Sequence, residues 1–170
     1  MHSSQNISLY QACEMGNIHA VRTLLAQANI TEIFNETSED FNTPLLLACK
    51  NGHTEIVGLL LKQKGIEDSL NILNNFDESP LYWACRAGHT EIVALLLQHT
   101  DIAQSLNLPN EHGDTPLLKA CMNGHIGIVV LLLQHTDIAQ SLNLPNNNGE
   151  TPLYWACRDM PSIEGSRHCY

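Results

Sequence analysis

Basic residues are scarce in this chain, and their scarcity limits the partners that it can bind. The 170 residues include eight Lys and Arg against eighteen Asp and Glu, so the formal net charge is −10. Binding to nucleic acids or to anionic membranes depends on clustered Lys and Arg. We therefore expect neither a nucleic acid nor a membrane as the partner.

Long apolar runs are also lacking. No stretch approaches the roughly 20 residues that a membrane-spanning helix needs. Residues 1–6 have neither the basic region nor the apolar region of a signal peptide. The sequence thus predicts a soluble, unprocessed, intracellular protein. The expected location is the cytoplasm, with the nucleus as the alternative.

A unit of 36 residues recurs along the chain, and this repeat is the strongest structural signal in the sequence. Thr43, Ser79, Thr115 and Thr151 each begin a Thr-Pro-Leu or Ser-Pro-Leu triplet at this interval, and Ile7 lies one interval earlier. This period predicts one elongated domain over residues 1–170. Its units are expected at about 2–37, 38–73, 74–109 and 110–145, with a partial unit at 146–160.

Five of the six cysteines follow the same period, at Cys13, Cys49, Cys85, Cys121 and Cys157. Equivalent atoms in stacked units lie about 10 Å apart, whereas a disulfide needs Cα atoms within about 7 Å. Buried, reduced thiols are therefore expected, and they fit a reducing compartment.

Each unit begins with the signals of a short helix. In the fourth unit, Thr115 is a predicted N-cap and Pro116 takes the first helical position. Gly124 can adopt the left-handed conformation that ends a helix. The first helix is therefore expected to be about two turns long.

A second, antiparallel helix is predicted over residues 56–61, 92–97 and 126–133. These runs are apolar all round, so we expect the second helix to be the more buried of the two. Thr54 and Thr90 precede the first two runs and are predicted to cap them with their hydroxyl groups.

After the second helix, each unit carries two apolar residues spaced i, i+4. This spacing predicts an extra helical turn that buries both residues. An Asn-rich and Gly-containing tip follows, such as residues 143–149, and it is expected to be exposed. The apolar pairs are Ile30 and Phe34, Ile66 and Leu70, Ile102 and Leu106, and Ile138 and Leu142.

The motif TPLxxAC, followed by a Gly-His pair and EIVxLLL, resembles the ankyrin repeat, whose signature includes T-P-L-H-x-A. Residues 43–61 read TPLLLACKNGHTEIVGLLL and residues 79–97 read SPLYWACRAGHTEIVALLL. The resemblance implies an all-α fold. The expected architecture is an ankyrin-repeat α-solenoid of stacked helix-turn-helix units joined by projecting hairpin-like loops.

The chain departs from the family pattern in three respects. Its unit is longer than the usual 33 residues, and the surplus after the second helix supports the extra helical turn. Leu46, Tyr82, Leu118 and Tyr154 replace the His after TPL, so more apolar packing is expected where that His makes hydrogen bonds between repeats. The last unit leaves the pattern after Arg158, and residues 161–170 are predicted to be extended or disordered.

No catalytic or metal-binding motif accompanies the repeat. Cys49 and His53, with their equivalents in the next two units, read C-x3-H. Each unit offers at most two such ligands, whereas structural zinc needs four at about 2.0–2.3 Å. The sequence also lacks a Gly-x-Ser-x-Gly elbow and a Gly-rich phosphate loop. We therefore expect no enzyme activity, no metal and no cofactor.

The resemblance implies a protein–protein interaction module that binds its partner through a concave face of loop tips and first helices. The tips are acidic and amide-rich, which favours a protein partner with a basic surface. Tip candidates are Glu39, Asp40, Asn42, Asn75, Phe76, Glu78, Glu111, His112, Asp114, Asn147, Asn148 and Glu150. First-helix candidates are Lys50, Asn51, Trp83, Arg86, Met122, Asn123, Trp155 and Arg158.

Two interpretations of the tryptophans stay open. Trp83 and Trp155 occupy a position that is Leu47 and Lys119 in other units, and a position that accepts Lys is not fully buried. The tryptophans either cover the helix of a neighbouring unit or contact the partner, where Trp is frequent among the residues that dominate affinity.

Two other functions also stay open. The chain could serve as a self-assembling structural solenoid that pairs through its C-terminal end, although a monomer is the simpler expectation. It could instead be a targeting segment of a larger enzyme or channel.

Overall fold

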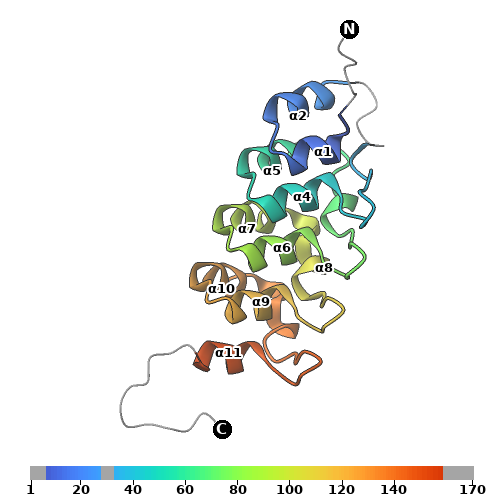
Figure 1. The fold of residues 1–170 in the computed structure, drawn as a ribbon. Helices are drawn as coiled ribbons and strands as arrows, with labels where there is room; N and C mark the ends of the chain where they lie inside the picture. The colour runs from blue at the N-terminus through green and yellow to red at the C-terminus, as the bar shows by residue number, and fades with distance from the viewer. Residues whose placement is uncertain (1–6, 28–32, 159–170) are drawn as a thin grey trace.

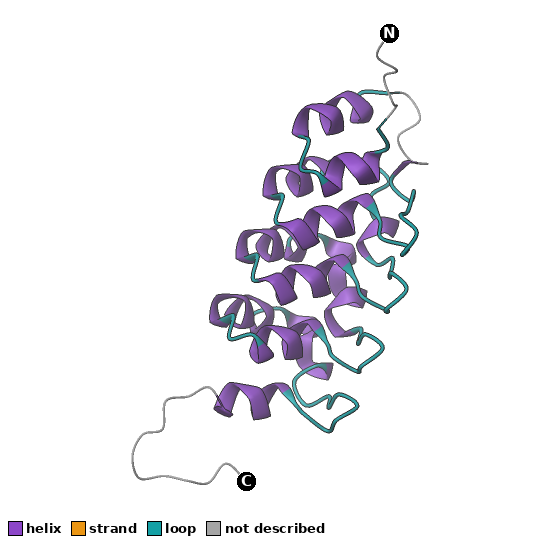
Figure 2. Ribbon diagram, viewed as in Figure 1, coloured by secondary structure: helices purple, strands orange, loops and turns teal. Residues whose placement is uncertain are grey.

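The computed structural model describes residues 7–27 and 33–158. All regular secondary structure in these ranges is helical, and the helices stack into a solenoid (Figure 1, Figure 2). This confirms the predicted all-α fold class. The predictions for residues 161–170 and for Ile30 lie outside the described residues.

Two layers of helices run the length of the solenoid. The second helices form one layer, and the first helices lie between that layer and the loop tips (Figure 1). Each first helix packs on the first helix of the next unit. The first helices are α1 (Leu9–Glu14), α4 (Pro44–Asn51), α6 (Pro80–Ala87), α9 (Pro116–Met122) and α11 (Pro152–Arg158). The second helices are α2 (Ile18–Leu25), α5 (Thr54–Leu60), α7 (Thr90–Leu97) and α10 (Ile126–Leu133).

The extra helical turn of the 36-residue unit is present. It is formed by η1 (Asp68–Leu70), by η2 (Thr100–Ile102) with α8 (Ala103–Asn107), and by η3 (Thr136–Gln140). Both members of the pairs Ile66/Leu70 and Ile102/Leu106 are buried, as predicted.

In the fourth unit, Ile138 is buried but Leu142 is 38% exposed, so the prediction is wrong for Leu142. The earlier segments pack against the segment of the following unit, as α8 does against η3. No further segment of this kind follows η3 within the described ranges, and Leu142 consequently lacks that cover.

A ladder of serines joins these extra turns, and the sequence analysis missed it. The Ser105 hydroxyl lies 2.9 Å from the carbonyl of Leu70 and 2.6 Å from Oδ1 of Asn71. Ser141 repeats this arrangement one unit later. The signal was available, because Ser-Leu-Asn recurs with the period of the unit.

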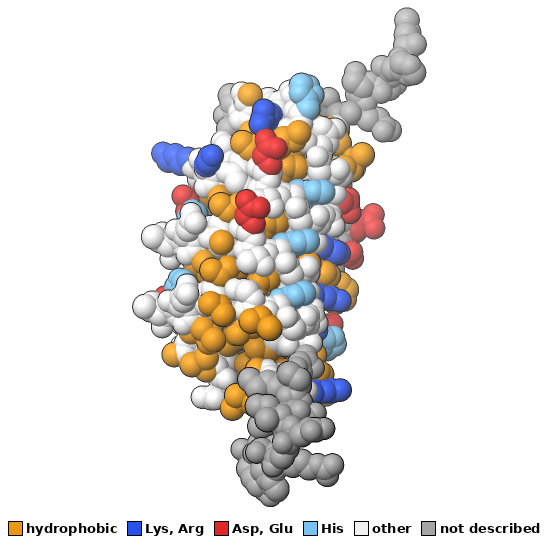
Figure 3. Space-filling view, turned by 90° about the vertical axis from the view of Figure 1, so that its left-hand side faces the viewer, with side chains coloured by type: hydrophobic (Ala, Val, Ile, Leu, Met, Phe, Trp, Pro, Cys, Tyr) orange, Lys and Arg blue, Asp and Glu red, His pale blue; other side chains and the backbone are white. Residues whose placement is uncertain are grey.

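The first helices, not the second, are the more buried layer, which corrects the prediction. All residues from 44 to 49 in α4 are buried, whereas only Ile128 and Leu132 are buried in α10. Ile126 is 75% exposed, and Val130 and Leu133 are 49% exposed. The second helices face solvent on one side, where Figure 3 shows hydrophobic side chains at the surface.

The first helices begin and end as predicted. The hydroxyl groups of Thr43, Ser79 and Thr115 accept a hydrogen bond from the backbone N–H three residues later, and Pro follows each of them. Gly52 and Gly88 then take left-handed conformations, with φ of 77° and 80°.

The helix α10 covers the predicted residues 126–133, but α5 and α7 begin one residue earlier than their predicted threonine caps imply. His53 and His89 are the N-caps of α5 and α7, and neither makes a side-chain capping bond. Thr54 and Thr90 are already the first helical residues, so the predicted threonine caps are wrong. The tight turn at Gly52 explains this, because the His53 N–H donates to the Ala48 carbonyl and places His53 at the helix start.

Four of the repeated cysteines, Cys13, Cys49, Cys85 and Cys121, are buried, and no disulfide joins them. This confirms the expected burial at those four positions. Burial raises the pKa of Cys13 to about 12. It raises the pKa of Cys49 and Cys85 further still.

Stability is therefore expected to fall at alkaline pH. The unfolded chain releases thiol protons near the ordinary pKa of 9.0, whereas the folded chain retains the Cys13 proton up to about pH 12. In that interval the unfolded state binds fewer protons, so the free energy of unfolding decreases by up to about 1.4 kcal/mol per pH unit for each thiol.

Urea denaturation at about pH 8 and about pH 10 measures this decrease. The variant Cys49→Ala should lose less stability between the two pH values than the wild type does. Equal losses in the two proteins would contradict the assignment of the effect to the buried thiols.

Candidate partner-binding surface

Each loop tip is a hairpin organised by one polar side chain. The side-chain oxygens of Asn74, Asn110 and Asn146 accept hydrogen bonds from the backbone N–H groups two and four residues later. Asn side chains commonly stabilise turns in this way. In the first tip, Ser38 takes the equivalent position and accepts a hydrogen bond from the N–H of Asn42.

Backbone hydrogen bonds link each tip to the next. The N–H of Asn75 donates to the carbonyl of Asp40 at 3.1 Å, and that of Asn147 donates to the carbonyl of His112 at 2.9 Å. The N–H of Glu111 makes the equivalent bond to the Phe76 carbonyl at 3.2 Å. The tips therefore form a continuous row with a fixed spacing, on the opposite side of the first helices from the second helices (Figure 1).

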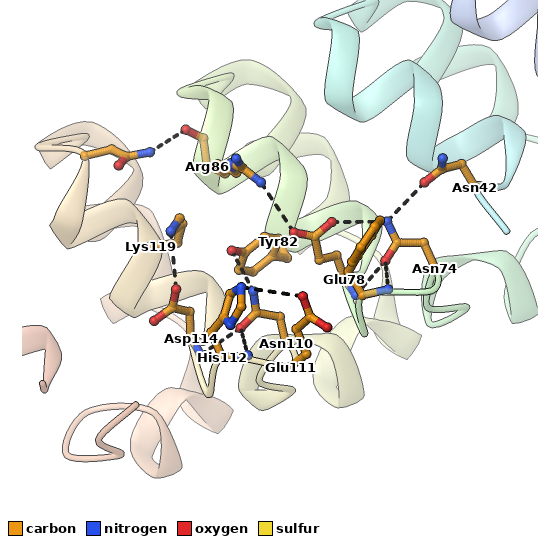
Figure 4. Close-up of polar contacts among 12 residues, drawn as sticks. Asn42, Asn74, Glu78, Tyr82, Arg86, Asn110, Glu111, His112, Asp114 and Lys119 are labelled. Carbon is orange, nitrogen blue, oxygen red and sulfur yellow. Dashed lines mark hydrogen bonds and ion pairs between the residues drawn. The ribbon is translucent and has the colours of Figure 1, made fainter. Parts of the chain in front are cut away.

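The residue that closes each of the first three hairpins is buried, although the sequence analysis placed it at an exposed tip. Asn42 is 6% exposed, Glu78 5% and Asp114 4%. These three predictions of exposure are wrong because the closing residue turns back toward the first helices and the neighbouring tip (Figure 4). The amide of Asn74, for example, donates to both Asn42 Oδ1 and Glu78 Oε2 at 3.1 Å.

Both buried carboxylates have a basic partner on a first helix. Glu78 Oε1 lies 3.4 Å from Nη1 of Arg86, and Asp114 Oδ2 lies 3.3 Å from Nζ of Lys119. The side chain of Lys119 is only 18% exposed, so this second pair is largely removed from water. Charge reversal at Asp114 would leave Lys119 beside a second buried cation, and it would therefore report on folding rather than on binding.

Tyr82 takes the place of the His in the T-P-L-H-x-A signature and still makes a hydrogen bond between units. Its buried hydroxyl accepts from Nδ2 of Asn110 at 3.0 Å (Figure 4). The expected apolar packing is confirmed for Leu46 and Leu118, which are fully buried, whereas Tyr154 is 52% exposed. Burial, together with the nearby carboxylates, raises the pKa of Tyr82.

Two first-helix candidates, Asn51 and Asn123, reach back to the preceding unit. The amide of Asn51 donates to the Glu14 carbonyl at 3.1 Å, and that of Asn123 donates to the Arg86 carbonyl at 2.7 Å. The ring of the next histidine approaches the same carbonyl in each case. Figure 3 shows the histidines as a column along the solenoid. Both Asn residues are exposed, but they also join units.

Most of the remaining tip candidates are exposed, which leaves them accessible to a partner. Glu150 is half-buried. The exposed tip candidates are Glu39, Asp40, Asn75, Phe76, Glu111, His112, Asn147 and Asn148.

The sequence analysis missed two further exposed tip residues, Phe41 and Asp77. Both have left-handed backbone conformations, with φ of 60° and 57°. Phe41 is 57% exposed and lies one tip away from Phe76, which is 45% exposed. The signal was available, because the equivalent residues of the next two tips are glycines.

The tryptophans on the first helices carry cations against their rings. Nζ of Lys50 lies 4.4 Å from the ring centroid of Trp83, and Cζ of Arg86 lies 4.5 Å from it. Cζ of Arg158 lies 4.6 Å from the ring centroid of Trp155. These distances fall within the range of cation–π attraction. Because Lys50 belongs to the preceding unit, Trp83 covers a neighbouring helix while remaining partly accessible, and both interpretations of the tryptophans stay open.

These residues form one surface with Met122, which we call the first-helix stripe. Lys50, Arg86, Met122 and Arg158 occupy the same position in successive units, and each tryptophan lies three residues earlier in its helix. Lys50, Met122 and the two tryptophans are half-buried, whereas the two arginines are exposed. The stripe consists of Lys50, Trp83, Arg86, Met122, Trp155 and Arg158.

Apolar residues are also exposed at the C-terminal end of the described solenoid. Leu153 is 65% exposed and Tyr154 52% exposed on α11, and no second helix follows α10 within the described ranges. Self-association through this end would use that surface, and it remains a prediction.

Nowhere in residues 7–27 and 33–158 do three His, Cys, Asp or Glu side chains gather as they would around a metal ion. Over the same ranges, no helix has the length and apolar character needed to cross a bilayer.

A family model for ankyrin repeats, in three copies, matches residues 9–105 and 103–164. No curated protein matches the chain.

Proposed function

Because this chain belongs to the ankyrin repeat family, whose members are generally protein–protein interaction modules, we propose that it binds a protein partner through the row of tips together with the first-helix stripe. The observation that carries this proposal is the row itself. It presents exposed charged and aromatic side chains on hairpins held in register by backbone hydrogen bonds. Such a preorganised surface loses little conformational entropy on binding. Ankyrin repeat proteins are typically not enzymes, and we propose no catalytic role.

The exposed carboxylates of the tips favour basic groups on the partner. Glu39, Asp40 and Asp77 are exposed, and none of them contacts a Lys or Arg among the residues that the structure describes. Glu111 is exposed as well, and its Oε1 lies 3.5 Å from Nε2 of His112. Their charge is therefore available to accelerate association with a basic surface, and added salt should weaken that effect.

The double variant Glu39→Lys/Glu111→Lys tests this proposal. It reverses two tip charges that pair with no Lys or Arg in the part of the chain that the structure describes, so the fold should persist. The affinity for a partner captured by the wild-type chain is expected to fall at least about tenfold, since like charges would then face each other. Calorimetric titration with the purified partner, at low and at physiological salt, measures the change.

A matched control separates the effect of the tip charges from the effect of the net charge of the protein. Glu67→Lys/Glu91→Lys makes the same change in net charge at two exposed residues outside the tips, and it should leave the affinity nearly unchanged. Equal losses in the two double variants, or no loss in either, would show that the tips do not contact the partner.

A further inference from the structure

The first-helix stripe is a local concentration of positive charge in an acidic chain. It holds three of the eight Lys and Arg residues, although the whole chain has a net charge of −10. Arg86 is partly neutralised by Glu78. Among the described residues, no carboxylate lies within ion-pair distance of Lys50 or Arg158. The stripe therefore attracts carboxylates, in contrast to the tips beside it.

Aromatic carbon alternates with these charges. Trp83 and Trp155 are half-buried, and the Nε1 atom of each ring is buried. The accessible part of each indole is therefore carbon, which suits contact with proline rings or aliphatic side chains. Met122 adds an apolar position in the unit between them.

The spacing of the stripe selects the conformation of its ligand. Packed helices lie about 8–10 Å apart, so equivalent residues of successive units recur at about that interval. A polyproline II segment rises about 3.1 Å per residue with three residues per turn, so every third residue points to the same side at intervals of about 9 Å. One turn of such a segment thus matches one unit of the solenoid.

We propose that the first-helix stripe binds an extended polyproline II segment of the protein partner, in which every third residue faces the stripe and three of four such residues are carboxylates. Carboxylates would lie opposite Lys50, Arg86 and Arg158, and an apolar side chain would lie opposite Met122. Prolines between the carboxylates would contact Trp83 and Trp155, because aromatic surfaces are the usual docking sites of such segments. This inference rests on the proposed function and specifies the partner at one part of the same surface.

A synthetic peptide provides the test. The probe is Glu-Pro-Pro-Glu-Pro-Pro-Leu-Pro-Pro-Glu, labelled for fluorescence anisotropy. The chain contains two tryptophans, both on the stripe, so their intrinsic fluorescence reports binding there independently. Saturable binding with a change in tryptophan fluorescence is expected. The peptide with Gln in place of Glu should bind at least about tenfold more weakly, because three charge pairs are lost.

Protein variants locate the peptide. Lys50→Gln/Arg158→Gln should weaken binding by about tenfold. The matched control Lys62→Gln/Lys64→Gln removes two exposed charges elsewhere and should change nothing. Both variants should remain folded, since none of these four residues makes a buried ion pair with another described residue, and circular dichroism verifies this.

Three results would overturn the inference. The first is that the Glu and Gln peptides bind with equal affinity. The second is that a peptide of the same composition, with its acids at every second position, binds as tightly as the probe. The third is that the two pairs of variants weaken binding of the probe equally. If the peptide does not bind while Glu39→Lys/Glu111→Lys still weakens binding of the partner, only this inference is wrong. If the peptide binds as expected while those tip changes leave the affinity for the partner unchanged, the role proposed for the tips is wrong instead.

Discussion

Replacing Gly113 with alanine is expected to lower the free energy of unfolding by about 3 kcal/mol, whereas Gly149→Ala should cost only about 1 kcal/mol. The two glycines take the same place in successive tips and have nearly the same left-handed backbone, with φ of 80° and 78°. Alanine is strained to the same degree at both positions. The difference arises from what its added methyl group meets.

At Gly113, a Cβ atom would lie 2.9 Å from the backbone nitrogen of Asn147 and 3.0 Å from Cα of Asn146. At Gly149, no atom of the residues that the structure describes would lie within 4 Å of the added Cβ. The Asn147 nitrogen also donates to the His112 carbonyl at 2.9 Å, so moving it aside would break the link between the two tips. Urea denaturation of both variants measures the difference. Equal losses would show that the contact between tips contributes nothing to stability.

The same position also shows where the chain accepts strain. In the first two tips it is occupied by Phe41 and Asp77, which keep the left-handed conformation without the freedom of glycine. A left-handed conformation costs a non-glycine residue roughly 1–2 kcal/mol. Phe41 gains little burial in return, since it is 57% exposed. Strain retained at an exposed aromatic residue is consistent with a role in contacting a partner.

The architecture was predictable because its signals are local and repeated. Thr43 and the Pro that follows it start a helix by capping and by a fixed φ, and Gly52 ends the helix by its left-handed conformation. The spacing of Ile66 and Leu70 similarly predicted the extra turn. Each signal depends on a few neighbouring residues, and its return in every unit separates it from chance.

Burial at the candidate surface was less predictable because it depends on contacts between units. Glu39 and Glu78 are both acidic tip residues in the sequence, yet Glu39 is exposed and Glu78 is buried against Asn74 and Arg86. The hairpin geometry determines which residue turns inward, and the pattern of residue types does not carry that information. The apolar run of α10 was misread for a similar reason, since its composition does not show which of its sides is covered.

The contacts that concentrate positive charge on the first helices also depend on the stacking of the units. The chain as a whole has a net charge of −10. Lys50 and Arg86 are distant in sequence, but stacking of the units brings both against the ring of Trp83. The positive stripe beside the acidic tips becomes visible when the units are stacked in the structure and their side chains are placed.

Truncation of Leu60 to alanine is expected to cost about 2–5 kcal/mol, because it leaves a cavity in the core. Leu60 is fully buried in α5, which packs against both α2 and α7. Leu132→Ala should cost less, although Leu132 is also fully buried, because no second helix follows α10 within the described ranges to limit relaxation around the cavity. Leu133→Ala, at a residue that is 49% exposed, serves as the control and should cost the least. Chemical denaturation of the three variants gives the order. In a solenoid, each unit is stabilised only by contacts with its adjacent units. If Leu60→Ala lowers the free energy of unfolding no more than Leu133→Ala does, the second helices do not contribute a continuous core.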